Sequence, residues 1–271
     1  MEIRNEIAEL LTEVKIKNPL VHHLTNYITA NDCANIVLAL GGSPVMADEE
    51  REVEEMVSIA SALVINIGSL TTLTIKAMLK AGKKANKKGI PVILDPVGIG
   101  ATSLRTNTVK EIVNEVKVSV IRGNMAEIKI LAGLKANIKG VDSREEINSE
   151  GERIAVELAR LYNCVIAVTG AKDIITDGKK VCIIENGHKM LSQVTGTGCM
   201  STSLVGTYSG VTNDYYLSSI AGIVSMGLAG EKAYKSLKNG EGTGTFRVKI
   251  IDNISLLTEK DFREGSKVHE Q

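Results

Sequence analysis

The sequence has no tryptophan, and aromatic residues make up only 3% of its 271 positions. Proteins that bind single-stranded nucleic acid stack the bases on aromatic side chains, and this composition offers no such platform. Net charge is also missing, because 32 Lys and Arg balance 32 Asp and Glu. There is therefore no long-range attraction to nucleic acid or to an anionic membrane. We interpret the basic run at 80–89 as the solvated end of a helix, where lysines complement the helix dipole.

Long apolar runs and clustered cysteines are absent as well. The longest apolar stretches, such as ALVINI and CVIAV, are far shorter than the ~18 residues that span a bilayer. The N-terminal segment MEIRNEIAELLTEVK has an acidic amphipathic pattern, without the basic start and apolar core of a signal peptide. The cysteines at 33, 164, 182 and 199 show no CxxC spacing, so we expect neither a disulfide nor a structural zinc. These features predict a cytoplasmic protein.

The sequence does contain a regular alternation of apolar runs and helical patterns. Strand-like runs lie at 62–68, 90–98, 118–124 and 164–170. Helical patterns follow or separate them over 71–89, 104–117, 124–133 and 145–163. Nearly continuous apolar strands joined by helices predict a mostly parallel central sheet with helices on both faces.

The pattern changes after residue 170. The segment DIITDGKKVCIIENG predicts two short strands joined by a turn, and so an antiparallel edge of the sheet. The chain is then nearly all helical from 197 to about 238, and GEGTGTFRVKIIDNISLL closes it. No linker or internal repeat divides it, so we expect one α/β domain over residues 1–271.

Polar residues end several of the predicted strands. Asp95 ends VILD, Arg122 and Asn124 lie in VIRGN, and Thr169 ends VIAVT. Ligands of open α/β sheets bind at the carboxyl ends of the strands. A carboxylate, a guanidinium and a hydroxyl at one edge would suit a nucleotide with a divalent metal.

Each of these residues also has a plainer interpretation. Asp95 precedes a proline, which is a common turn arrangement. Asn124 and Glu127 fit a capping box at the start of a helix, and Thr169 could belong to a turn. Arg122 is harder to explain structurally, because a guanidinium without a partner in an apolar span is costly.

The loop TGTGC, residues 195–199, is the most informative motif. Gly196 and Gly198 allow close approach of the backbone, so the N–H groups of Thr197, Gly198 and Cys199 can form an anion hole at a helix start. The loop is neither a Walker motif nor GxGxxG after a first strand. Cys199 could be an inert packing residue, but at a helix N-terminus we expect its pKa to be lowered.

Seven ordered segments resemble those of the hydroxyethylthiazole kinase family, of the ribokinase-like superfamily, over nearly the whole chain. They are HHLTNYITANDCANIVLALGGSPVMA, ALVINIGSL, PVILDPVGIGAT, VIRGNMAEI, AVTGAKDIITDG, VTGTGCMSTSLVG and GTGTFRVKIID. The resemblance implies a ribokinase-like fold. It also implies ATP-dependent phosphorylation of the alcohol 4-methyl-5-(2-hydroxyethyl)thiazole, a step of thiamine salvage.

The resemblance implies roles for individual residues. Met46, Gly196 and Asn26 match positions that bind the thiazole alcohol. Arg122 and Thr169 match positions that bind ATP.

Further positions relate to the metal, the base and the assembly. Asp95 and Glu127 match acidic positions of the Mg²⁺ and phosphate region. Cys199 stands where sugar kinases of the superfamily carry the aspartate that acts as general base. The family forms a ring-shaped homotrimer with active sites between subunits, so Met46 would face a neighbour's pocket.

Other functions stay open at this point. A related small alcohol such as hydroxymethylpyrimidine could be the acceptor. Cys199 could be the nucleophile of an acyl transferase or hydrolase with His22 or His23, although we interpret both histidines as structural because no third ligand or orienting group is visible. The chain could also be a nucleotide sensor without catalysis.

Overall fold

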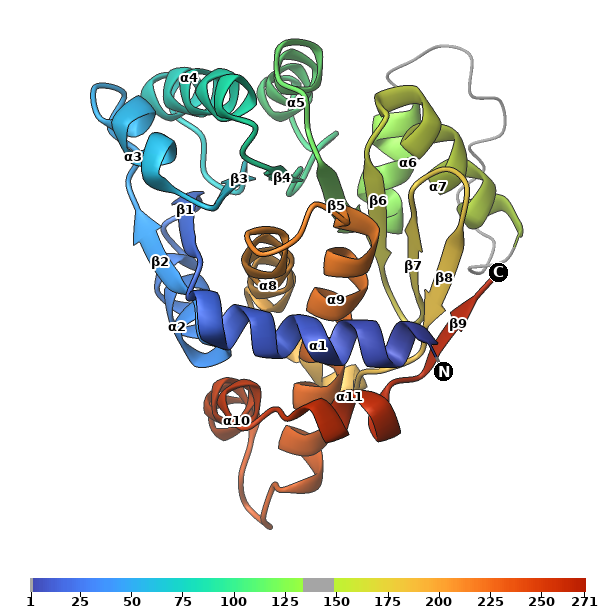
Figure 1. Ribbon diagram of the computed structural model, residues 1–271. Helices are drawn as coiled ribbons and strands as arrows, with labels where there is room; N and C mark the ends of the chain where they lie inside the picture. Colours follow the sequence, from blue (N-terminus) through green and yellow to red (C-terminus); the bar gives the residue numbers. More distant parts are fainter. Residues whose placement is uncertain (1, 134–148) are drawn as a thin grey trace.

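A computed structural model describes residues 2–133 and 149–271, and these residues contain one sheet in the order β2-β1-β3-β4-β5-β6-β7-β8-β9 (Figure 1). Its strands are β1 (Leu20–Leu24), β2 (Ser43–Met46), β3 (Ala62–Asn66), β4 (Val92–Asp95), β5 (Val120–Asn124), β6 (Val165–Thr169), β7 (Asp173–Thr176), β8 (Val181–Ile184) and β9 (Val268–Glu270). The strands from β2 to β6 pair in parallel, and those from β6 to β9 pair antiparallel. The predicted mostly parallel sheet with an antiparallel edge is confirmed.

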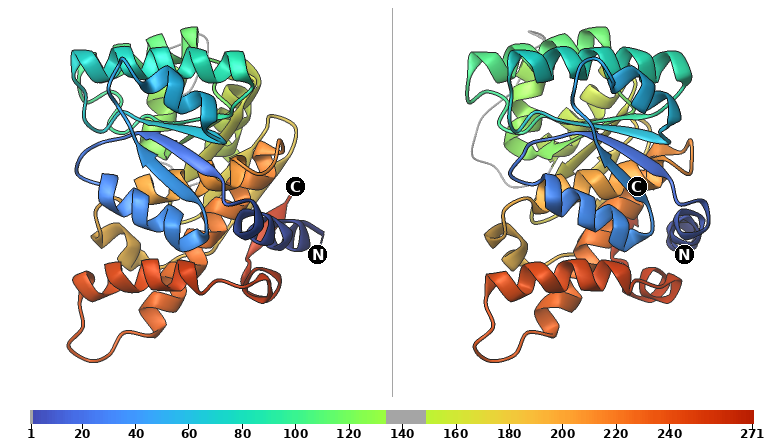
Figure 2. Two further views of the ribbon diagram at one scale, coloured as in Figure 1. Left: turned by 60° about the vertical axis from the view of Figure 1, so that its left-hand side comes forward. Right: turned by 90° about the vertical axis from the view of Figure 1, so that its left-hand side faces the viewer.

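Helices cover both faces of this sheet, as the two side views make plain (Figure 2). One face carries α3 (Val53–Ile59), α4 (Thr72–Lys88), α5 (Ser103–Glu115), α6 (Met125–Gly133) and α7 (Ser149–Tyr162). The other carries α1 (Glu2–Lys17), α2 (Ala30–Leu40), α8 (Thr197–Ser209), α9 (Tyr215–Lys235), α10 (Thr243–Ser255) and α11 (Glu259–Gly265). A short 3₁₀ helix, η1 (Lys189–Gln193), precedes α8. No helix among the described residues has the length and apolarity needed to cross a membrane.

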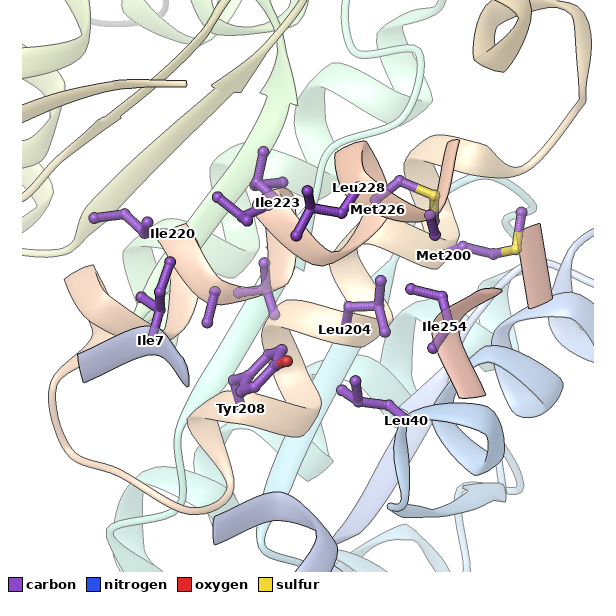
Figure 3. Packing of buried hydrophobic residues seen from close by; sticks show 14 of the residues in the cluster. Ile7, Leu40, Met200, Leu204, Tyr208, Ile220, Ile223, Met226, Leu228 and Ile254 are labelled. Atoms are coloured by element: carbon purple, nitrogen blue, oxygen red, sulfur yellow. The ribbon is translucent and has the colours of Figure 1, made fainter. Parts of the chain in front are cut away.

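Helix α8 runs through the middle of the larger apolar cluster, and every residue from Cys199 to Ser209 is buried. Figure 3 shows Met200, Leu204 and Tyr208 of this helix packed among side chains of α9 and of α1, α2 and α10. Burial on all sides explains why α8 has no polar stripe, unlike a surface helix. Because a close-packed interior resists displacement, the N-terminus of α8 is held at a fixed place against the sheet.

The sequence prediction missed β1, α2, β2 and α3 before residue 62, and η1, α10, α11 and β9 in the C-terminal part. β1 has the sequence LVHHL, and its two histidines hid an otherwise apolar strand. β2 and β9 are short, with four and three residues, and η1 lies in a polar loop. The first part of the helix predicted over 145–163 falls on residues 145–148, which lie outside the described residues.

Candidate active site

The carboxyl ends of the parallel strands and the N-terminus of α8 form the candidate site. Asn66 at the end of β3 is paired with Asp95 at the end of β4. Asn124 at the end of β5 is likewise paired with Thr169 at the end of β6. In-register parallel strands bring these side chains to one edge, as predicted.

The first turn of α8 approaches this edge because of its glycines. Gly196 is the N-cap residue and has a φ of +85°, a left-handed conformation that favours glycine. A Cβ there would also lie 2.7 Å from Cγ2 of Thr29. Gly196 therefore cannot carry a side chain without strain, and the N–H groups of the first turn stay uncovered for an anion.

Asp95 is completely buried. Its Oδ2 accepts hydrogen bonds from Thr202 Oγ1 at 2.7 Å and from Asn66 Nδ2 at 3.1 Å. Its Oδ1 is buried and has no hydrogen-bond partner. Burial raises the pKa of Asp95 to about 6, against the opposing effects of Arg122 and these hydrogen bonds. An unsatisfied carboxylate oxygen at a site of this kind is a candidate cation ligand.

Arg122 lies between Asp95 and the start of α8. Its Nη1 is 3.8 Å from Asp95 Oδ2, and its Nη2 donates a hydrogen bond to Thr169 Oγ1. The guanidinium packs on the backbone of Gly198, since a Cβ at Gly198 would lie only 2.7 Å from Nη1. The structure brings Arg122 together with Asp95, Thr169 and the glycine loop, while its buried Nε has no hydrogen-bond partner.

Cys199 is buried and lies in the same first turn of α8. Its Sγ accepts hydrogen bonds from Asn66 Nδ2 at 3.2 Å and from Asn26 Nδ2 at 3.6 Å. The pKa expected from the sequence was wrong in direction: burial and then the Asp95 carboxylate raise the pKa of Cys199. Desolvation of the thiolate outweighs the helix N-terminus and the hydrogen bonds to the sulfur.

One pocket borders this turn, and a second lies by the carboxyl ends of β1, β2 and β3. The first, with a volume of about 550 Å³, is lined by residues that include Arg122, Thr169, Asp173, Thr197 and Gly198. The second, of about 620 Å³, is lined by residues that include His23, Tyr27, Met46, Gly68 and Arg105.

Hydrogen bonds link the two pockets through the buried residues. Gly68 N, at the second pocket, donates to Asn66 Oδ1 at 2.9 Å, and Asn66 contacts Cys199. Gly198, beside Cys199 in sequence, lines the first pocket. The predicted ATP residues Arg122 and Thr169 line the first pocket, and the predicted substrate residue Met46 lines the second. Asn26, Gly196 and Cys199 line neither pocket, and Cys199 lies on the hydrogen-bonded path between them.

Glu127 has the structural role that its sequence context allowed. Its Oε2 accepts from Asn124 N at 2.9 Å, and Asn124 Oδ1 accepts from Glu127 N at 2.9 Å, which is a capping box. Its Oε1 accepts from Gly98 N at 3.0 Å, in the loop after β4. Its negative charge still acts on Asp95, whose pKa it raises.

The two histidines are buried neighbours on β1. His22 Nε2 lies 2.7 Å from Ala47 O, while His23 Nδ1 and Nε2 face Val21 O and Ser203 Oγ. Burial lowers the pKa of both rings, that of His23 to about 4, so both are neutral near pH 7. Their hydrogen bonds go to backbone and hydroxyl oxygens rather than to the thiol, which argues against a cysteine–histidine nucleophile.

The sequence reasoning missed three polar residues of the site. Asn66, buried at the end of β3, ends an apolar run just as Asp95 does, so the same signal could have found it. Thr202 sits one helical turn after Gly198 and reaches Asp95. Asp173 lines the first pocket, accepts a hydrogen bond from Gly170 N at 2.9 Å, and has a pKa that burial raises to about 7.

Comparison with known proteins decides the family. The model of the hydroxyethylthiazole kinase family matches residues 11–260. The chain belongs to the hydroxyethylthiazole kinase family. A hydroxyethylthiazole kinase of Alkaliphilus oremlandii is 53% identical over 270 residues, which cover 100% of both chains. The structure of the Pyrococcus horikoshii hydroxyethylthiazole kinase superimposes with a TM-score of 0.89 at 40% identity, covering 98% of each chain.

A more distant likeness extends the fold beyond the hydroxyethylthiazole kinase family. The pyridoxal kinase of Staphylococcus aureus, solved with AMP-PCP, has a TM-score of 0.60 at 14% identity, covering 78% of this chain and 87% of that one. At that identity the likeness concerns the fold alone. It confirms the ribokinase-like architecture that the sequence predicted.

Proposed function

We propose that the chain transfers the γ-phosphoryl group of ATP to the hydroxyl group of 4-methyl-5-(2-hydroxyethyl)thiazole, a thiamine salvage step. Membership of the hydroxyethylthiazole kinase family supports this reaction. The observation that carries it in the molecule is a pocket lined by Arg122 and the glycine-rich start of α8, joined to a second pocket by the buried hydrogen bonds from Cys199 through Asn66 to Gly68. One pocket is for the phosphoryl donor and the other for the acceptor.

The first pocket would hold ATP. Arg122, tied to Thr169, faces the phosphates and neutralises their charge. The N–H groups of Thr197, Gly198 and Cys199 form the anion hole for the transferring group. These donors are fixed before the reaction because α8 is held on all sides, so they need little reorganisation as charge develops.

The second pocket would hold the thiazole alcohol. Met46 on its wall offers an apolar, polarisable side chain to the ring. Asn26 contacts Cys199, and Gly196 begins the turn that carries Cys199, where the hydroxyl group has to arrive. A thiazole ring against Met46, with its hydroxyethyl arm toward Cys199, would have its hydroxyl oxygen directed at the anion hole.

The transfer step follows from this placement. The alcohol oxygen forms a bond to the γ-phosphorus, while the bond from that phosphorus to the β,γ-bridging oxygen breaks and ADP takes the electron pair. The proton of the alcohol passes to Sγ of Cys199. Because its raised pKa makes the thiolate a minor species near pH 7, Cys199 is a weakly populated base. A loose transition state tolerates this, since the nucleophile's proton can leave late.

We include Mg²⁺ in the proposal because the residues fit it. The unpaired, buried Oδ1 of Asp95 is an available hard oxygen ligand, and Glu127 adds negative charge nearby. Among the described residues there is no group of three His, Cys, Asp or Glu that could enclose a metal. This suits Mg²⁺, which is usually held by one or two carboxylates, with phosphates and water completing its shell. When bound, the ion would neutralise charge on the phosphates.

We also propose a homotrimer of one-domain subunits, residues 1–271, acting in the cytoplasm where ATP is available. Exposed apolar side chains near the second pocket support shared sites: Tyr27 is 83% exposed, Ile28 63%, Leu73 66% and Met46 38%. An exposed apolar group of this kind marks a surface that another protein covers. A second subunit there would close the thiazole pocket.

Coupled detection of ADP tests the function. We expect ADP release with ATP and Mg²⁺ only when the thiazole alcohol is added, and weaker release with hydroxymethylpyrimidine. Preference for the pyrimidine would reassign the acceptor. ATP binding without release of ADP would favour a nucleotide sensor. Acyl transfer or hydrolysis that a thiol reagent blocks would favour Cys199 as the nucleophile of an acyl transferase or hydrolase.

A further inference from the structure

The side chain of Asn66 contacts the proposed base and the proposed metal carboxylate with one atom. Its Nδ2 lies 3.2 Å from Cys199 Sγ and 3.1 Å from Asp95 Oδ2. Asn66 is 1% exposed and does not line either of the two pockets. It therefore acts on the reaction, if at all, through these two neighbours.

The orientation of this amide is fixed by its other contacts. Its Oδ1 accepts a hydrogen bond from Gly68 N at 2.9 Å and another from Asn26 Nδ2 at 3.0 Å. The backbone N–H can only donate, so the oxygen must face Gly68. Asn26 is oriented in turn, because its Oδ1 accepts from Thr29 N at 3.1 Å. The nitrogen of Asn66 is consequently forced toward the sulfur and the carboxylate.

The two neighbours depend on Asn66 to different degrees. Oδ2 of Asp95 retains a 2.7 Å hydrogen bond from Thr202 if Asn66 is removed. Sγ of Cys199 would keep the longer contact from Asn26, at 3.6 Å, and the hydroxyl of Thr29. Asn66 gives Sγ a shorter hydrogen bond than Asn26 does, whereas the shorter bond to Oδ2 comes from Thr202, so the loss should be felt mainly at Cys199.

We infer that Asn66 is a positioning residue for phosphoryl transfer, whose amide holds Sγ of Cys199 at a set place beside Asp95 and stabilises the thiolate form that accepts the proton. The inference rests on the proposed function for its kinetic consequence. A negatively charged sulfur accepts a hydrogen bond more strongly than a thiol does, so an N–H donor aimed at Sγ favours the form that acts as base.

A double-mutant cycle measures this action. We expect Asn66→Ala to lower kcat about 10-fold, with the KM for ATP nearly unchanged, because it removes a hydrogen bond to a charged group. In the Cys199→Ala background the same change should lower kcat less than about 3-fold, since the group through which it acts is gone. Equal losses in both backgrounds would mean a merely structural role and would overturn the inference.

A matched control is available at Asn86, which also donates and accepts through its amide, to Lys117 O at 2.8 Å and from Lys117 N at 2.7 Å. Asn86→Ala, in α4 and away from the site, should leave kcat unchanged. Asn66→Asp provides a second variant that keeps the volume and both acceptor contacts while removing the donor. Its carboxyl group would lie beside the buried carboxylate of Asp95, so we expect it to lose activity and to unfold at a lower temperature than the wild type.

A second readout does not require turnover. The rate at which methyl methanethiosulfonate modifies Cys199, followed by mass spectrometry of the peptide, is measured against pH. Other charged or titratable groups lie close to this sulfur: Asp95 on β4, Cys33 on α2 and Arg122 on β5, which packs on the neighbouring Gly198. None of them is changed in the variants. We expect Asn66→Ala to raise the midpoint by about one pH unit, Asn66→Asp to raise it further because it adds a carboxyl group beside the sulfur, and Asn86→Ala not to move it.

The two readouts separate the possible failures. If the wild type releases no ADP with the thiazole alcohol, the proposed function fails, and the modification midpoint still decides whether Asn66 acts on Cys199. If the wild type turns over but neither the midpoint nor the coupling differs from the Asn86→Ala control, the inference about Asn66 is wrong and the proposed function stands.

Discussion

Gly198 offers a test of the proposed phosphate site, because its backbone touches the guanidinium of Arg122. A Cβ at Gly198 would lie 2.7 Å from Nη1, 3.2 Å from Nη2 and 3.3 Å from Cζ. Ordinary contacts of a Cβ begin at 3.4 Å, so Gly198→Ala requires the guanidinium to move by about 0.7 Å. Arg122 has little freedom, since its Nη2 bonds to Thr169 and its side chain is only 12% exposed.

The expected loss follows from the size of this movement. A misplacement of about 1 Å can cost about 100-fold in rate, which corresponds to about 2.7 kcal/mol of barrier. We expect Gly198→Ala to lower kcat/KM for ATP roughly 10- to 100-fold and to leave the KM for the thiazole alcohol nearly unchanged. Coupled ADP release with each substrate varied in turn measures both quantities.

Gly244 is a close control within the chain. Gly198 and Gly244 are each the second residue of a helix, and each follows a Gly-Thr pair. A Cβ at Gly244 would have nothing within 4 Å, so Gly244→Ala should leave the kinetics unchanged. If Gly198→Ala acts through Arg122, it should add little to the loss already caused by Arg122→Ala. A Gly198→Ala enzyme with kcat/KM for ATP within about 2-fold of the wild type would refute the reasoning.

Three further predictions concern the base, the metal carboxylate and the assembly. We expect Cys199→Ala to lower kcat about 100-fold, while Cys199→Asp keeps substantial activity. The kcat of the wild type should rise from pH 7 to 9 as the thiolate forms. Equal activity of Cys199→Ala and the wild type would refute the assignment of Cys199 as the base. Burial raises the pKa of Asp95 to about 6, above its unfolded value, so its ionisation weakens folding as pH rises from about 4 to 6. Asp95→Asn should therefore increase the free energy of unfolding at pH 7.5 by up to about 3 kcal/mol and raise Tm, while it abolishes activity. A lower Tm in calorimetry would contradict this. Tyr27→Glu should yield monomers in sedimentation and raise the KM for the thiazole alcohol, whereas an unchanged trimer would place the interface elsewhere.

The local pattern was enough to predict much of the architecture. β3, β4 and β6 are apolar runs bounded by turn residues, and α4 ends at Gly89 after a lysine-rich turn, so sequence neighbours alone define them. Strand β1 was missed because its burial comes from the surrounding fold, and β2 was missed because it is short and only partly buried. Two histidines in β1 are tolerated inside only because oxygens such as Ala47 O and Ser203 Oγ are placed to meet them.

Some features of the candidate site follow from the sequence alone, and others depend on the tertiary structure. Sequence by itself determined which residue types stand at the strand ends and that Gly196 and Gly198 open a helix, because strand length and backbone freedom depend on residues close together in the chain. Tertiary structure alone decided the state of Cys199. Its helix N-terminus suggested a lowered pKa, but the packing of α8 against the sheet buries the sulfur beside Asp95 and raises it. Desolvation depends on everything that surrounds a group, and for Cys199 that includes Asn66, 133 positions away in the chain.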